Sequence, residues 1–156
     1  MRYTGKTNKY DPDEQLTKNF KMGEFASPDG FIVWNAETEK FLSMLQEFRD
    51  WISCPISPSS MYRSPEHNKR IGGASNSMHL QGMAVDIPWR GTKPEYLTAD
   101  NKRKLEIESN IETFWRKLCE KHNIKGGSLE VCPAHFHLDI RGWDNGRFKV
   151  YYGQSK

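Results

Sequence analysis

At 156 residues, the chain is long enough to bury a hydrophobic core without disulfide support and short enough to form one domain. Aromatic residues make up 12%, which excludes an intrinsically disordered chain, and a formal net charge of +3 is too small to indicate a nucleic-acid-binding protein. A mild positive excess of this kind favours an anionic polymer as a partner.

Residues 1–18 are polar, without hydrophobic periodicity, so we expect an extended or poorly ordered arm followed by a single domain over residues 19–156. Asn35 is a candidate N-cap for a helix that runs to about Trp51, because its apolar residues recur at three- and four-residue steps. This helix is predicted to lie against a sheet. Residues 56–62 then form a short strand or an extended connection.

Pro65 suits the first turn of a short helix, which Gly72 and Gly73 end. A loop over residues 74–81 leads into a strand predicted from Met83 to Trp89. The longest helical pattern runs from about residue 100 to 122 and has a predicted apolar face. That face consists of Leu105, Ile111, Phe114, Trp115 and Leu118.

Residues 128–131 and 135–141 are predicted to pair as strands, and Asp144-Asn145-Gly146 followed by residues 148–152 indicates a final hairpin. These elements predict an α+β fold with a small, mainly antiparallel sheet and helices packed on one side.

The cysteines Cys54, Cys119 and Cys132 are odd in number and include no Cys-x-x-Cys pair, so we expect free thiols and no thiolate metal site. Residues 1–14 lack the apolar segment of a signal peptide, and no run of about eighteen apolar residues occurs. We therefore expect synthesis in the cytoplasm without a signal peptide, and no membrane insertion.

His79 and Asp86 lie seven residues apart around Gly82 and provide two ligand types that suit zinc. A catalytic zinc usually takes three protein ligands and one water, so a third ligand must come from elsewhere. The segment 134–141 alternates polar and apolar residues with the period of a strand. One face carries His135, His137 and Asp139, and the other, predicted to face the core, carries Phe136, Leu138 and Ile140.

Segment 77–86 has five fixed positions, Ser-x-His-x-x-Gly-x-Ala-x-Asp, and segment 136–139 reads Phe-His-Leu-Asp. Together they resemble the LAS-type zinc peptidases of peptidoglycan stem peptides: D-Ala-D-Ala carboxypeptidases, VanX-type dipeptidases and phage L-Ala-D-Glu endolysins. The similarity extends from about Phe20 to Arg141, and five fixed positions in ten are hard to meet by chance. It implies a hedgehog/D-Ala-D-Ala-peptidase-like fold.

The resemblance implies that His79, Asp86 and His137 bind Zn²⁺ and leave one coordination position for water; the alternative, a structural site, usually closes all four positions. Asp139 would accept the second ring N–H of His137. A surface salt bridge between Asp139 and Arg141 is the alternative.

Arg63 precedes His79 by sixteen residues, the spacing at which carboxypeptidase members place an arginine that binds a substrate carboxylate. The alternative is a surface arginine that closes a loop. Ser77 resembles a serine that hydrogen-bonds the substrate, although a hydroxyl that only shapes the loop would look the same.

The general base is where the sequence departs from part of the family, because Ala134 stands where some members carry Glu or Asp. His135 resembles the His-x-His arrangement of the carboxypeptidase branch and is a candidate to accept a proton or stabilise developing negative charge. Glu130 is the second candidate.

The function implied is zinc-dependent hydrolysis of a stem-peptide bond, of the L-Ala-D-Glu or D-Ala-D-Ala type, with endopeptidase action favoured. With no signal peptide expected, a monomeric phage lysin that reaches the wall after holin-type release, or as a virion component, fits best. The alternative is a non-catalytic, zinc-bearing wall-binding or virion-structural module, which the missing carboxylate at Ala134 favours.

Overall fold

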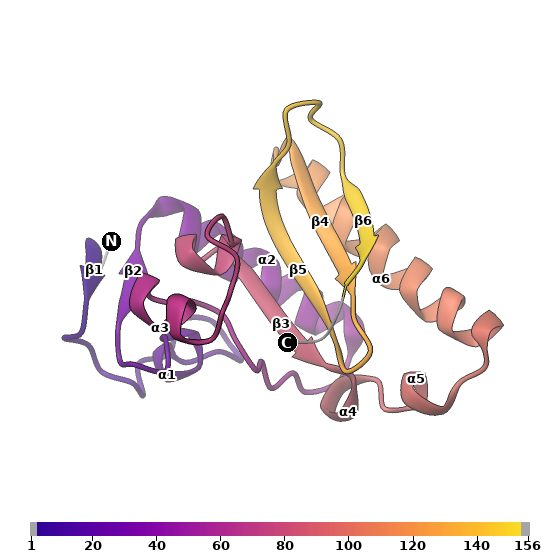
Figure 1. Ribbon diagram of the computed structural model, residues 1–156, viewed down its shortest axis with the longest axis horizontal. Helices are drawn as coiled ribbons and strands as arrows, with labels where there is room; N and C mark the ends of the chain where they lie inside the picture. Colours follow the sequence, from indigo (N-terminus) through magenta and orange to yellow (C-terminus); the bar gives the residue numbers. More distant parts are fainter. Residues whose placement is uncertain (1–2, 154–156) are drawn as a thin grey trace.

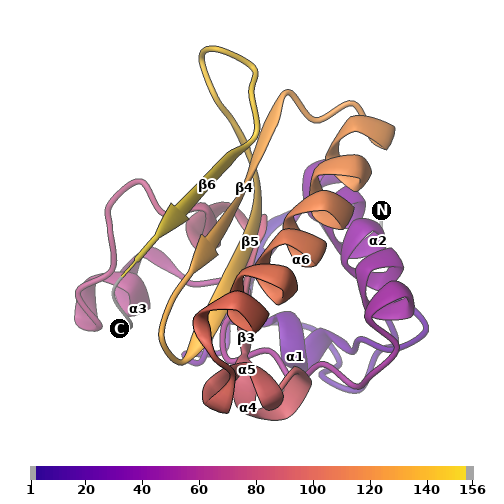
Figure 2. The same cartoon turned by 90° about the vertical axis from the view of Figure 1, so that its right-hand side faces the viewer.

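The computed structural model describes residues 3–153 and has an α+β fold in which a four-stranded sheet carries two long helices on one face (Figures 1 and 2). The strand order is β3 (Ala84–Pro88), β5 (His135–Gly142), β4 (Gly126–Val131) and β6 (Lys149–Tyr152). Both pairings of β5 are antiparallel, whereas β6 joins β4 in parallel. The predicted fold class is confirmed.

The two long helices are α2 (Ala36–Ile52) and α6 (Asn101–Lys121), and they lie behind the sheet as viewed in Figure 1. The Asn35 side chain accepts hydrogen bonds from the backbone N–H groups of Glu37 and Thr38, which confirms the predicted N-cap. Short helical elements lie in the connections: α1 (Met22–Phe25), α3 (Pro65–Arg70), the 3₁₀ turn η1 (Met78–Gln81), α4 (Trp89–Thr92) and α5 (Glu95–Thr98).

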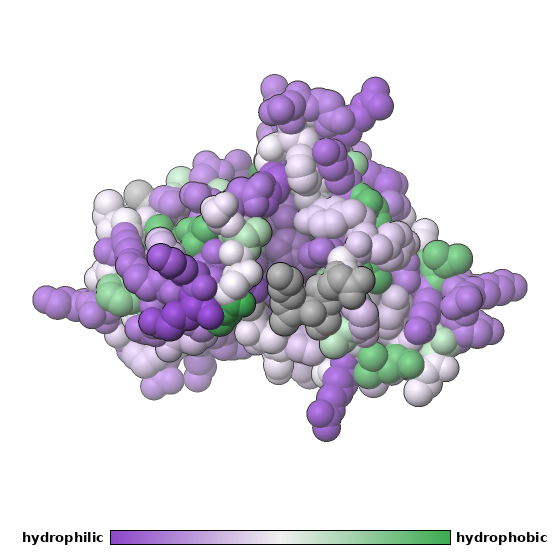
Figure 3. Space-filling model, viewed as in Figure 1, coloured by the Kyte–Doolittle hydropathy of each residue, from purple (hydrophilic) through white to green (hydrophobic). Residues whose placement is uncertain are grey.

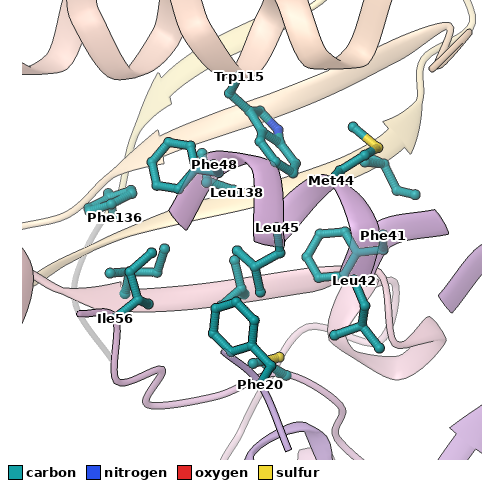
Figure 4. Packing of buried hydrophobic residues seen from close by; sticks show 14 of the residues in the cluster. Phe20, Phe41, Leu42, Met44, Leu45, Phe48, Ile56, Trp115, Phe136 and Leu138 are labelled. Atoms are coloured by element: carbon teal, nitrogen blue, oxygen red, sulfur yellow. The ribbon is translucent and has the colours of Figure 1, made fainter. Parts of the chain in front are cut away.

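Aromatic side chains fill the space between these helices and the sheet (Figure 4). Phe48 of α2 is central, with its ring centroid 6.0 Å from that of Trp115 on α6 and 6.1 Å from that of Phe136 on β5. Phe136 and Leu138 are fully buried, and Ile140 is 5% exposed, so the predicted apolar face of this strand does face the core. The opposite face of β5 is left to polar residues.

Leu105 does not belong to the apolar face of α6, contrary to the sequence prediction, since it is 59% exposed. The buried residues of this helix are spaced at three and four positions and include Ile107, Ile111 and Trp115. Leu105 precedes Ile107 by two residues, which places it on a different side of the helix. Phe114 is half-buried and stacks on Trp51 at 4.5 Å between ring centroids.

The predicted final hairpin is also wrong, because β6 pairs with β4 rather than with β5. Both edges of β5 are already occupied, by β3 and β4, so the last strand cannot pair with β5 and joins the outer edge of β4 instead. Tyr152 fastens β6 to the helical layer, since its hydroxyl donates to Glu108 Oε1 of α6 at 2.8 Å.

Part of the predicted arm forms a short strand, β1 (Gly5–Thr7), which pairs antiparallel with β2 (Ile32–Trp34). Lys6 also forms an ion pair with Glu66 at 3.0 Å, an exposed contact that contributes little to stability. All three cysteines are free thiols, as expected. Within residues 3–153, no helix combines the length and apolar character needed to cross a membrane.

Gly82 ends η1 with φ of +69°, and a Cβ at this position would lie 2.8 Å from Thr38 Cγ2 and 2.9 Å from Phe25 Cζ. Gly72 has nearly the same φ of +71° but open space around it. We predict that Gly72→Ala costs only the left-handed strain, about 1–2 kcal/mol of unfolding free energy, whereas Gly82→Ala costs about 1–3 kcal/mol more through overpacking.

Urea denaturation of the two variants measures this difference. Equal midpoints would show that the packing around Gly82 relaxes without penalty and would contradict the prediction.

Candidate metal centre and cleft

Two adjacent elements, η1 and β3, present the first pair of predicted ligands, and Gly82 makes the turn between them. The Ser77 hydroxyl accepts the backbone N–H of His79 at 3.2 Å and so caps η1, which orients the histidine. Asp86 lies in the middle of β3. His137 of β5 is its direct cross-strand partner. The sheet register therefore brings residues that are 51 positions apart into contact.

The three side chains converge on one buried point. Asp86 Oδ1 lies 2.9 Å from His137 Nδ1 and 3.2 Å from His79 Nε2, and one ligand atom from each residue lies within 4.8 Å of the others. Their exposed fractions are 2% for His79 and 8% for Asp86 and His137. His79 Nε2 is buried and makes no hydrogen bond with any described residue. A borderline-soft dication fits this donor set and would satisfy that nitrogen.

The outward nitrogens of both imidazoles have hydrogen-bond partners. His79 Nδ1 donates to the Met61 carbonyl oxygen at 2.5 Å, and His137 Nε2 lies 2.7 Å from Asp139 Oδ2. With the outward nitrogens so engaged, His79 Nε2 and His137 Nδ1 face into the group, the orientation that a metal ligand requires. Asp139 bonds the Arg141 backbone N–H at 3.0 Å rather than the guanidinium, so no side-chain salt bridge joins these two residues.

The pKa shifts show that this point attracts positive charge. Burial lowers the pKa of His79, against the opposing effect of Asp86. Burial raises the pKa of Asp86, but its close contacts with the His137 and His79 imidazoles outweigh burial, and the net shift is downward. Burial likewise disfavours charge on His137, yet hydrogen bonds with Asp139 and Asp86 raise its pKa to about 10. Two carboxylates thus stabilise a cation here.

Arg63 lies at the edge of the group and contacts one of the predicted ligands. Its Nη2 donates to Asp86 Oδ2 at 3.2 Å, and its Nε donates to Ser60 Oγ at 3.0 Å. Arg63 therefore holds the carboxylate oxygen that does not face the imidazoles. It also lines the cleft, so it is more than a surface arginine.

Both candidate bases, His135 and Glu130, line a cleft of about 1080 Å³ around the group, and Ser77 lines it as well. His135 Nε2 lies 3.9 Å from Asp86 Oδ1, whereas Glu130 stands opposite His137 on β4. Figure 3 shows this face of the molecule hollowed beside the sheet, with hydrophilic residues in the hollow and some hydrophobic residues beside it. The predicted site residues thus line one cleft, except Asp139, which is fully buried and contacts His137.

Main-chain groups of the connection before α3 complete the surroundings, and sequence reasoning missed them. Besides the Met61 carbonyl, the Ser60 carbonyl accepts the Asp86 N–H at 2.9 Å, and the Ser59 N–H donates to the Asp86 carbonyl at 3.0 Å. These bonds hold the free edge of β3 in place. Backbone carbonyls are chemically alike at every position, so only the prediction of an extended segment over 56–62 pointed to them.

The chain was compared with known proteins. No curated protein matches it. A family model described as Peptidase M15 matches residues 16–114, more than half of the chain. The match includes Arg63, Ser77, His79 and Asp86, and it ends within α6, so His137 lies beyond it. The chain therefore belongs to the peptidase M15 family and is a metallopeptidase by that membership.

Proposed function

We propose that residues 19–156 form a zinc-dependent peptidase that hydrolyses a stem-peptide bond of peptidoglycan. M15 peptidases are zinc-dependent and act on peptidoglycan-like substrates. The observation that carries the proposal for this chain is the buried Nε2 of His79, which lies 3.2 Å from Asp86 Oδ1 at the cleft without forming a hydrogen bond among the described residues. A buried polar nitrogen normally has a hydrogen-bond partner, so one that lacks such a partner indicates a site for a bound metal ion.

In this proposal His79, Asp86 and His137 hold the zinc. A bound zinc supplies a water of lowered pKa and polarises the scissile carbonyl. The Met61 carbonyl and Asp139 keep the two imidazoles in the required tautomers and orientations.

The remaining roles fall to residues that line the cleft. His135 moves a proton at its Nε2, which lies 3.9 Å from Asp86 Oδ1. Arg63 binds a substrate carboxylate beside the scissile bond, and the Ser77 hydroxyl donates to the peptide while its oxygen continues to cap η1.

For the bond that is cut, we propose L-Ala-D-Glu rather than D-Ala-D-Ala, with a phage lysin as the setting. D-Glu has a free carboxylate next to the bond, so Arg63 has an anionic partner there as well as at a chain terminus. A cut close to the glycan releases a whole crosslink in one step, which is what wall degradation requires. The proposed enzyme acts as a monomer.

Incubation with purified sacculi tests the function. The zinc-loaded protein should release new amino groups, and mass spectrometry of the soluble muropeptides should show stems that begin with D-Glu. Protein that pellets with the wall without releasing amino groups would be a binding module. Free D-Ala as the sole product would show that the cleaved bond is D-Ala-D-Ala and not L-Ala-D-Glu.

Arg63→Ala is predicted to lower kcat/KM by at least about tenfold, which corresponds to about 1.4 kcal/mol of transition-state binding. Zinc content should stay unchanged, because Arg63 contacts Oδ2 of Asp86 and the imidazoles face Oδ1. Steady-state kinetics with parallel elemental analysis measures both quantities. Turnover equal to that of the unmodified protein would show that Arg63 does not bind the substrate.

A further inference from the structure

One end of the cleft carries two cationic side chains that the proposed mechanism does not use. Arg141 stands at the end of β5 and Lys149 at the start of β6, and both line the cleft together with Trp143. Asp139 accepts a hydrogen bond from the Arg141 backbone N–H and not from its guanidinium, which therefore faces other partners.

Both cations contact the ring of Trp143. Its ring lies 3.9 Å from Lys149 Nζ and 5.3 Å from the Arg141 guanidinium carbon, measured to the ring centroid. The indole N–H donates to the Gly127 carbonyl at 3.1 Å, which ties the ring to β4. Arg141 Nη2 donates to the Asn76 carbonyl across the cleft at 2.8 Å. Cation–π contacts of this kind position a charge without neutralising it.

Neither cation has an anionic partner among residues 3–153. Two carboxylates line the cleft: Asp86 contacts Arg63 and both imidazoles, and Glu130 forms no ion pair with Arg141 or Lys149. Asp139, buried beneath it, bonds His137 and the Arg141 backbone. Two like charges around one aromatic ring repel each other, so an anion bound between them would relieve that repulsion. This end of the cleft is therefore suited to an anionic ligand.

The strand geometry fixes how far this position lies from the metal centre. His135, His137, Asp139 and Arg141 alternate along the same face of β5, and Arg141 follows His137 by four residues. At about 3.3 Å per residue, the two backbones are about 13 Å apart. Arg141 therefore starts about 13 Å further along the strand than His137, a separation that suits contact with a substrate residue two or three positions from the scissile bond.

We propose that Arg141 and Lys149, held by Trp143, form a second carboxylate-binding subsite that recognises an acidic group of the substrate remote from the cleaved bond. The subsite rests on the proposed function and narrows its substrate class to peptides with two carboxylates, one for Arg63 and one for this pair. In a stem peptide cut at L-Ala-D-Glu, the α-carboxylate of D-Glu lies beside the bond and pairs with Arg63, so the terminal carboxylate of the stem is the group expected in this subsite.

The test uses the stem tetrapeptide L-Ala-γ-D-Glu-L-Lys-D-Ala and two analogues, one with the terminal carboxylate amidated and one with the D-Glu α-carboxylate amidated. Isothermal titration calorimetry at low temperature measures Kd for the zinc-loaded protein, and KM replaces Kd for any peptide recovered cut. Arg141→Gln/Lys149→Gln is the test variant. Arg147→Gln, an exposed arginine in the same connection and outside the cleft, is the matched control.

Amidation of the recognised carboxylate should weaken binding about tenfold in the unmodified protein and in Arg147→Gln, and less than about twofold in the double variant. The analogue that shows this pattern identifies which carboxylate is bound. Lys149→Gln alone, at an exposed position that does not threaten folding, should give an intermediate factor.

The subsite would be overturned if amidation raised Kd by the same factor in the double variant and in the unmodified protein. It would also be overturned if neither amidation changed Kd in the unmodified protein. Binding that follows the expected pattern without any hydrolysis would support the subsite and contradict the proposed function, so the two failures are distinguishable.

Discussion

His137→Ala is expected to reduce bound zinc from about one ion per chain to a small fraction of that value and to abolish peptide hydrolysis. The substitution removes one of three ligands from a site that needs all three to hold a catalytic zinc. It also leaves Asp139 without its imidazole partner, 0% exposed and charged, which adds to the loss of the site. Elemental analysis after dialysis and a muropeptide assay measure the two effects.

His67→Ala is the matched control, because His67 belongs to α3 and does not line the cleft. Its zinc content and activity should equal those of the unmodified protein. Full zinc in the His137→Ala protein would refute the ligand assignment. If that protein had also lost hydrolysis, His137 would act in the reaction without binding the metal.

His135→Ala is expected to lower kcat by about 10²- to 10⁴-fold, the range typical of a lost general acid–base group, while zinc content is retained. The side chains of His135 and Glu130, the two candidates for the general base, point in different directions. His135 Nε2 lies 3.9 Å from Asp86 Oδ1, beside the metal position. Glu130 Oε2 instead packs so closely on Gly153 that a Cβ there would lie 1.9 Å from it.

Glu130→Gln should therefore lower kcat by less than about tenfold, and the pair of variants separates the two candidates. Zinc analysis of both proteins excludes an indirect effect through metal loss. A large loss of kcat in Glu130→Gln with near-normal turnover in His135→Ala would reassign the base to Glu130.

Several features were predictable because they depend on local sequence. The alternation over residues 134–141 identified the two faces of β5, since side chains on a strand point in turn to opposite sides. Asn35 was recognised as an N-cap from its position alone. Leu105 shows the limit of that reasoning, because the buried side of α6 is decided by how the helix lies against β4 and α2.

The sequence by itself determined the candidate ligands of the proposed metal centre, the strand that presents His137 and the turn at Gly82, because each follows from residue chemistry or from short-range periodicity. Only the tertiary structure decided that β6 joins β4, that the Met61 carbonyl holds His79, and that Arg141 and Lys149 share the ring of Trp143. These contacts join residues far apart in the chain, and many alternative partners have the same chemistry. Packing of the whole domain selects among them.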